Sequence, residues 1–196
     1  MNRRKKIGVF GGLFDPPHIG HLIIAQSILE EFHFEKIIFI PAGNPPHKRR
    51  YSPYKIRFHM TKLAIEDNKK FLISNIEEKI TGKTYTVEVI KELKRRINGA
   101  LYLIIGSDQW AEIKTWKNPD ELFKHCRVIV APRAPYKIKK VRRLSNKLLI
   151  AHTPLINISS SDIRKRLKRN RSIQYLVPSK VHQYIKKKRL YQSVDS

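Results

Sequence analysis

Short apolar segments alternate with amphipathic ones along nearly the whole chain, and this alternation constrains the fold more than any other feature. The apolar segments are rich in Ile, Leu and Val and lack the polar alternation of a half-exposed strand. They therefore predict parallel strands that are buried on both faces. They lie at 7–10, 36–40, 101–105, 127–131 and 147–151, with a shorter candidate at 71–74.

Helical segments lie between these strands. Ser52 is a capping residue directly before Pro53, and this pair predicts a helix that continues to about Asp67. Residues 84–96 and 118–125 show similar signals. When helices and strands alternate in this way, each helix forms a right-handed crossover between two parallel strands.

The sequence therefore predicts an α/β fold, a doubly wound, Rossmann-like parallel sheet with helices on both faces. No internal repeat or low-complexity linker divides the chain. We expect one nucleotide-binding domain over residues 1–196, with closing helices at about 159–191.

The stretch Gly8–Leu22 combines a strand, paired glycines, an Asp-Pro-Pro turn and the start of a helix. Glycines let a backbone approach a phosphate closely, and a helix N-terminus offers free N–H donors and the positive end of a dipole. His18 and His21 are three positions apart, so they project from one face of that helix. The core-facing stripe is supplied by other residues, Leu22, Ala25, Leu29 and Phe32. The two histidines are not needed for burial, and the segment predicts a site for a nucleotide phosphate.

A second phosphate site is predicted at Ile158–Arg164, whose sequence is Ile-Ser-Ser-Ser-Asp-Ile-Arg. Ser159 and Asp162 have the spacing of a capping box, and the free N–H groups of that turn can hold a phosphate. Ser160 adds a hydroxyl donor, and Arg164 adds a bidentate group that is always charged. Alone, the segment would be an ordinary capped basic helix, and the first motif favours the phosphate interpretation.

Further candidates follow predicted strands, where doubly wound sheets bind their ligands. His47 and Lys48 end a proline-rich loop and either meet phosphate oxygens or form an ordinary surface loop. Gly106 offers a flat surface for a base, and Asp108 lies within reach of ribose hydroxyls. Trp116 either stacks on an aromatic ring or is partly buried in the core, and spacing does not decide between these.

Composition bears on the partners of the chain. The 41 Lys and Arg exceed the 16 Asp and Glu, for a formal net charge of +25, which attracts polyanions. The basic residues are scattered and no aromatic residues interleave with them, so no specific nucleic acid is expected. No apolar run is long enough to cross a bilayer, so we expect no membrane partner. The single Cys126 fits a reducing, cytoplasmic location, and homo-oligomerisation stays open.

Several common enzyme sites are excluded. Gly82-Lys83-Thr84 has the ending of a P-loop, but Glu77 stands where its first glycine must be. The chain has no Cys/His cluster with zinc spacing and no Gly-x-Ser-x-Gly nucleophile elbow. A hydrolase with a serine nucleophile is therefore unsupported.

Together, Phe10–His21 and Ile158–Arg164 resemble the motifs of the His-x-Gly-His nucleotidyltransferase superfamily. Within it, the chain looks like the bacterial nicotinate mononucleotide adenylyltransferases, and the similarity extends from Lys5 to Tyr191. The resemblance implies AMP transfer from ATP to nicotinate mononucleotide, giving deamido-NAD and pyrophosphate by direct in-line attack without a covalent intermediate. It also implies Mg²⁺ carried by ATP, with no metal bound by the protein itself.

The resemblance implies a role for each matching residue. The implied catalytic residues are His18, His21 and Arg164. The implied ATP site comprises these three with Gly11, Gly12, Phe14, Gly106, Asp108, Ser159 and Ser160. The implied nicotinate mononucleotide site comprises His47, Lys48, Thr86 and Trp116. Glu88 and Val89 replace an Asp-Thr pair that is frequent in the family, close to the expected nicotinate pocket.

Four alternatives fit part of the sequence. A cytidylyltransferase or a pantetheine-phosphate adenylyltransferase would contain the first motif, but Trp116 and the Pro-Pro-His-Lys loop favour the nicotinate enzyme. A class I aminoacyl-tRNA synthetase needs a much longer chain and a Lys-rich loop. A nucleic-acid-binding module would fit the charge but leave the histidine and serine motifs unexplained.

Overall fold

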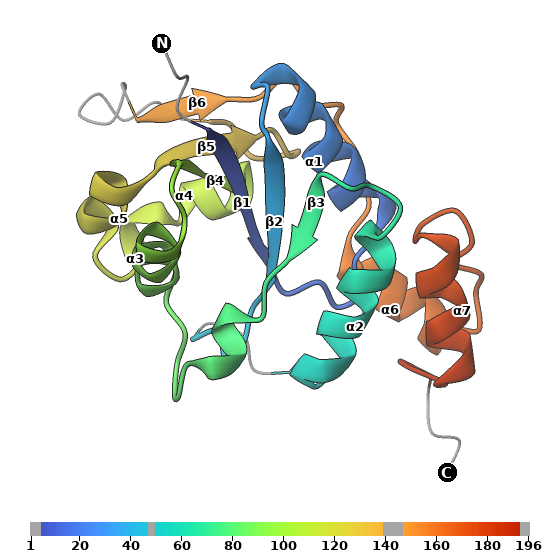
Figure 1. Ribbon diagram of the computed structural model, residues 1–196. Coiled ribbons are helices and arrows are strands. Elements are labelled where there is room, and N and C mark those ends of the chain that lie inside the picture. The colour runs from blue at the N-terminus through green and yellow to red at the C-terminus, as the bar shows by residue number, and fades with distance from the viewer. Residues whose placement is uncertain (1–4, 47–49, 139–146, 193–196) are drawn as a thin grey trace.

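The computed structural model describes residues 5–46, 50–138 and 147–192 (Figure 1). Within these ranges six strands form one sheet, and every neighbouring pair is parallel. The strands are β1 (Lys6–Gly12), β2 (Lys36–Pro41), β3 (Phe71–Ile73), β4 (Ala100–Gly106), β5 (Arg127–Ala131) and β6 (Leu148–Ile150). Their order across the sheet is β3-β2-β1-β4-β5-β6, so the direction of winding reverses between β1 and β4. The predicted doubly wound parallel sheet is confirmed.

Helices cover both faces of the sheet. The described ranges contain α1 (Ile19–Glu31), α2 (Tyr54–Ile65), α3 (Thr86–Arg96), α4 (Ser107–Ala111), α5 (Pro119–His125), α6 (Ser160–Lys168) and α7 (Ser179–Lys187). Short 3₁₀ turns occupy Ile76–Lys79 and Ile113–Thr115. Figure 1 shows α1, α2, α6 and α7 on one side of the sheet and α3, α4 and α5 on the other.

Two apolar clusters, one on each face, hold these layers together. Successive side chains of a strand point to opposite faces, so Ile37 and Phe39 enter one cluster while Ile38 and Ile40 enter the other. All four side chains are almost fully buried. Burial on both sides explains why the strands are continuously apolar in sequence rather than alternating.

The helix boundaries depart from the sequence prediction in two places. The helix expected to start at Pro53 starts one residue later, at Tyr54, with Pro53 rather than Ser52 as its N-cap, and the helix expected at 84–96 starts two residues later, at Thr86. The five-residue helix α4 was not predicted, and it begins directly after β4 because Gly106 serves as its N-cap. The Gly106 N–H donates to Gln109 Oε1 at 3.3 Å, which secures this tight strand-to-helix transition. Among the described residues, no helix has the length and apolar character needed to span a membrane.

Candidate active site

The N-terminus of α1 holds the two predicted histidines side by side. His18 is the N-cap residue, and its backbone N–H donates to Nδ1 of His21 at 3.1 Å. The two imidazole centroids are 3.7 Å apart. Gly20 leaves room for the His18 ring, because a Cβ at this position would lie 3.1 Å from Nδ1 of His18 and would push the ring aside by a few tenths of an ångström. The sequence predicted that neither ring is needed for burial, yet His18 is only 6% exposed.

Both imidazoles are held in their neutral form. Burial, followed by the charge of Arg133, lowers the pKa of His18 to about 4. The same causes, together with the His18 ring, lower the pKa of His21 well below its usual value. Because His21 Nδ1 accepts a hydrogen bond, its neutral ring carries the proton on Nε2, where it can donate to a ligand. His18 Nδ1 is buried and has no partner among the described residues.

These pKa values predict a loss of stability in mild acid. The His18 pKa is about 4 in the folded protein and near 6.5 in an unfolded chain, so protons favour the unfolded state below pH 6.5. The free energy of unfolding should fall between pH 6.5 and 4, by up to about 1.4 kcal/mol per pH unit for this histidine. Urea unfolding of wild type and His18→Gln across that range checks this. Parallel pH curves for the two proteins would contradict the assignment.

The second predicted motif meets the first at this point. Ser160 Oγ donates to the Pro16 carbonyl at 2.8 Å, and the Arg164 guanidinium donates to the Asp15 carbonyl at 2.6 Å. Ser159 caps α6 by accepting the Asp162 N–H at 3.0 Å, as the sequence predicted. The N-terminal ends of α1 and α6 are thereby tied to the same Asp-Pro-Pro turn, and both helix dipoles offer their positive ends there.

Buried polar side chains hold the Asp-Pro-Pro turn in place. The Asp15 carboxylate is 1% exposed and accepts hydrogen bonds from the Ser52 N–H at 3.1 Å and the Tyr191 hydroxyl at 2.5 Å. Arg57 is fully buried and donates to the carbonyls of Ser52 and Leu13, at 2.8 and 3.0 Å. Sequence patterns gave no signal for the contacts that bring Arg57 and Tyr191 to this turn, because they join residues 44 and 176 positions apart.

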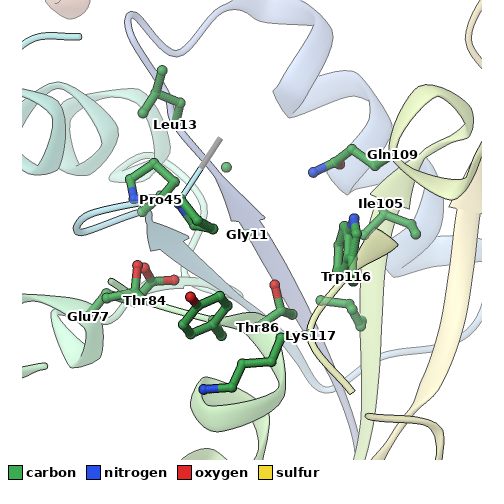
Figure 2. A pocket seen from close by; sticks show the side chains of 15 residues that line it. Gly11, Leu13, Pro45, Glu77, Thr84, Thr86, Ile105, Gln109, Trp116 and Lys117 are labelled. Carbon is green, nitrogen blue, oxygen red and sulfur yellow. The ribbon is translucent and has the colours of Figure 1, made fainter. Parts of the chain in front are cut away.

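A cavity of about 200 Å³ opens beside the glycine turn (Figure 2). Trp116 lies on one side of it, and Glu77 and Thr84 lie on the other. Four predicted residues line the cavity, namely Gly11, Gly12, Thr86 and Trp116. A side chain at Gly11 would meet no atom within 4 Å, so glycine keeps the cavity floor open.

Two charged residues of the cavity wall were missed by sequence analysis. Glu77 accepts the Gly43 N–H at 2.8 Å, and burial raises the pKa of its carboxyl group. Lys117 lies 4.2 Å from the centroid of the Tyr85 ring and pairs with Glu88 at 2.7 Å. Glu88 therefore anchors a lysine of the cavity wall.

The residues predicted for adenosine lie at the ends of the neighbouring strands. Gly106 packs under Asp108, since a Cβ at this glycine would lie 2.3 Å from Asp108 Oδ1. Asp108 Oδ2 pairs with Arg133 at 3.1 Å, which the sequence did not predict. Phe14 is 1% exposed and its ring packs on Phe10, so its side chain belongs to the core and only its backbone faces the turn. The carboxyl ends of β1 and β4 and the α1 histidines therefore lie at the same edge of the sheet.

The structure thus brings most of the predicted site residues to a single region, but it does not describe two of them. His47 and Lys48 lie outside the described residues, so their predicted role stays a prediction. Pro45 and Pro46, which directly precede these two residues in the proline-rich loop, line the cavity. No group of three or more His, Cys, Asp or Glu able to hold a metal is found in the described part of the chain.

Known proteins match this chain over most of its length. The family described as Cytidylyltransferase-like matches residues 9–166. A probable nicotinate-nucleotide adenylyltransferase of Thermoanaerobacter sp. (strain X514) is 43% identical, with 97% of this chain and 96% of the relative covered. The protein of the same name from Moorella thermoacetica (strain ATCC 39073 / JCM 9320) is 36% identical, with 97% and 94% covered.

Solved structures match the fold. Nicotinic acid mononucleotide adenylyltransferase of Plasmodium falciparum, complexed with NaAD, superposes with a TM-score of 0.83 at 23% identity. The match covers 95% of this chain and 97% of that one. At this identity, the likeness establishes a shared arrangement of strands and helices.

Proposed function

Since the chain belongs to the cytidylyltransferase-like family and, within it, to the nicotinate-nucleotide adenylyltransferases, we propose that it transfers AMP from ATP to nicotinate mononucleotide. The products are deamido-NAD and pyrophosphate. The observation that carries the proposal is the meeting of the α1 and α6 N-termini at Asp15-Pro16, beside a cavity that holds Trp116. The two helix N-termini bind the triphosphate of ATP, and the cavity binds the acceptor.

The chemistry needs positioning and charge neutralisation rather than a strong base. The phosphate of the acceptor is already ionised at neutral pH, so it attacks the α-phosphorus of ATP in line and pyrophosphate leaves, with no covalent enzyme intermediate. The neutral histidines donate hydrogen bonds to the migrating adenylyl group. Arg164, Ser160 and the N–H groups that open α6 stabilise the charge of the departing pyrophosphate.

The donor set of the site fits a magnesium ion held mainly by phosphate oxygens. Each described carboxylate near the strand ends has at least one partner: Asp15 binds Tyr191, Glu77 binds Gly43, and Oδ2 of Asp108 binds Arg133. Bound Mg²⁺ would neutralise charge on the triphosphate while keeping several of its waters. The protein's own task is to orient that complex through Ser160, Arg164 and the two helix ends.

A direct assay tests the proposal. With ATP, magnesium and nicotinate mononucleotide, we expect stoichiometric pyrophosphate and deamido-NAD, and much weaker turnover when CTP replaces ATP. Preference for CTP would favour a cytidylyltransferase, and turnover with phosphopantetheine alone would favour the pantetheine enzyme. Either result, or no pyrophosphate combined with tight, salt-sensitive DNA binding, would refute the proposed reaction.

Trp116 provides a prediction specific to the acceptor. Trp116→Ala should raise KM for nicotinate mononucleotide about 10-fold, because a stacked aromatic pair contributes up to about 1.5 kcal/mol. KM for ATP should stay within about twofold. Trp116→Phe keeps an aromatic face and should recover most of the affinity. Steady-state kinetics with each substrate varied in turn would contradict the assignment if only KM for ATP rose.

A further inference from the structure

Arg133 lies at the edge of the sheet where the two substrates are proposed to meet. It follows β5 by two residues, so it stands at the carboxyl end of a strand that neighbours β4. Its backbone is fixed by the fully buried Ser107, whose Oγ accepts the Arg133 N–H at 2.8 Å and donates to the Arg133 carbonyl at 3.0 Å. The guanidinium therefore extends from a rigid base, with 43% of the side chain exposed.

The pair that Arg133 forms with Asp108 is incomplete. Only Asp108 Oδ2 contacts the guanidinium, at 3.1 Å, while Oδ1 is buried without a partner among the described residues. A buried carboxylate oxygen needs a hydrogen-bond donor, and a ribose hydroxyl supplies one. A partly exposed ion pair contributes little stability, so the guanidinium can leave it at small cost.

The charge of Arg133 also acts on the histidines. Burial lowers the pKa of both His18 and His21, and the positive charge of Arg133 lowers it further by disfavouring their protonated forms. Because the two imidazoles are neutral, they contribute donors but no net charge. Positive charge at the α-phosphate must then come from other side chains, and Arg164 is tied to the Asp15 carbonyl on the side of α6.

We propose that Arg133 is a further catalytic residue. When the ribose hydroxyls of ATP bind Asp108, the guanidinium leaves this carboxylate and binds the α-phosphate. The exchange follows from the covalent structure of ATP, since the α-phosphate is bonded to the same ribose. A ribose anchored on Asp108 places that phosphate between Arg133 and the histidines. Arg133 then neutralises the charge that builds on the α-phosphate oxygens during transfer. This inference rests on the adenylyl transfer proposed above.

The test compares Arg133→Ala and Arg133→Lys with Arg127→Ala, a matched control at the opposite end of β5. Arg133→Ala should lower kcat/KM for ATP about 100-fold, and KM for nicotinate mononucleotide should change less than twofold. Arg133→Lys should recover part of the loss, because lysine keeps the charge without the bidentate fork. Arg127→Ala should match wild type.

A second readout needs no turnover. In Arg133→Ala, NMR titration should show the pKa of the His18 imidazole moving up from about 4, whereas Arg127→Ala should leave it unchanged. Binding of a non-hydrolysable ATP analogue should weaken about tenfold in Arg133→Ala alone. If the wild-type protein is inactive, the proposed reaction is refuted. The His18 titration and the binding of the ATP analogue still test the role of Arg133. The inference is overturned if Arg133→Ala keeps turnover within threefold of wild type, or if neither His18 titration nor analogue binding changes.

Discussion

Replacement of His18 by alanine is expected to lower kcat roughly 10³-fold while the protein stays folded. His18 caps α1 at the point where the glycine turn and α6 converge, and in the proposed reaction its neutral ring donates a hydrogen bond to the migrating adenylyl group. Removing one preorganised donor from a transition-state site costs about 10²–10³ in turnover. The upper end applies here, because the His21 ring also loses its neighbouring ring, whose centroid is 3.7 Å away.

The measurement is kcat from pyrophosphate release, with circular dichroism and urea unfolding as tests of folding. His59→Ala is the matched control, because His59 is exposed on α2 and contacts Tyr184 rather than the site. We expect the control to keep wild-type kcat. If His18→Ala retains more than a tenth of wild-type turnover, the role assigned to this imidazole is refuted.

Replacement of Arg57 by methionine is expected to destabilise the protein by about 3–5 kcal/mol, the usual cost of removing one member of a buried ionic network. The variant would leave the carbonyls of Leu13 and Ser52 without their donor. It would also remove the cation that faces Asp15, a carboxylate that is 1% exposed. Methionine preserves much of the volume, so the loss arises from polarity rather than from a cavity.

Thermal unfolding should show a decrease in Tm of roughly 10 °C, given about 2–4 °C per kcal/mol for a chain of this size. Arg96→Met serves as the control, since Arg96 is exposed on α3 and pairs only with Glu92 among the described residues. We expect the control to shift Tm by less than about 2 °C. Equal Tm values for the two variants would show that the buried network does not stabilise the turn.

Much of the architecture was accessible from the sequence because its signals are local. The strands were predicted where apolar runs are continuous. Each of β1, β2, β4 and β5 includes the whole predicted segment, whereas β3 and β6 cover three residues of theirs. The exception is α4, whose five residues are too few for a helical period to be recognised. Its formation depends on the Gln109 side chain folding back to Gly106, a contact that composition does not reveal.

The site was predicted less completely, for a physical reason. Residues within a motif, such as His18 and His21, are held together by a helix turn and could be placed from their spacing. Arg133 and Tyr191 have no such local partner, and Arg57 acts mainly through the distant carbonyl of Leu13. Each acts through a contact with a distant segment, and only the packed structure brings those segments together.

The sequence by itself determined that strands alternate with helices, that two capped helix ends carry serine, histidine and arginine, and that glycines permit close backbone approach. These properties depend on neighbours within a few residues. Only the tertiary structure decided that both helix ends share the Asp15-Pro16 turn, that buried Arg57 fixes this turn, and that burial keeps the histidines neutral. Such features depend on burial and on contacts across the sheet, because desolvation and charge act through space rather than along the chain.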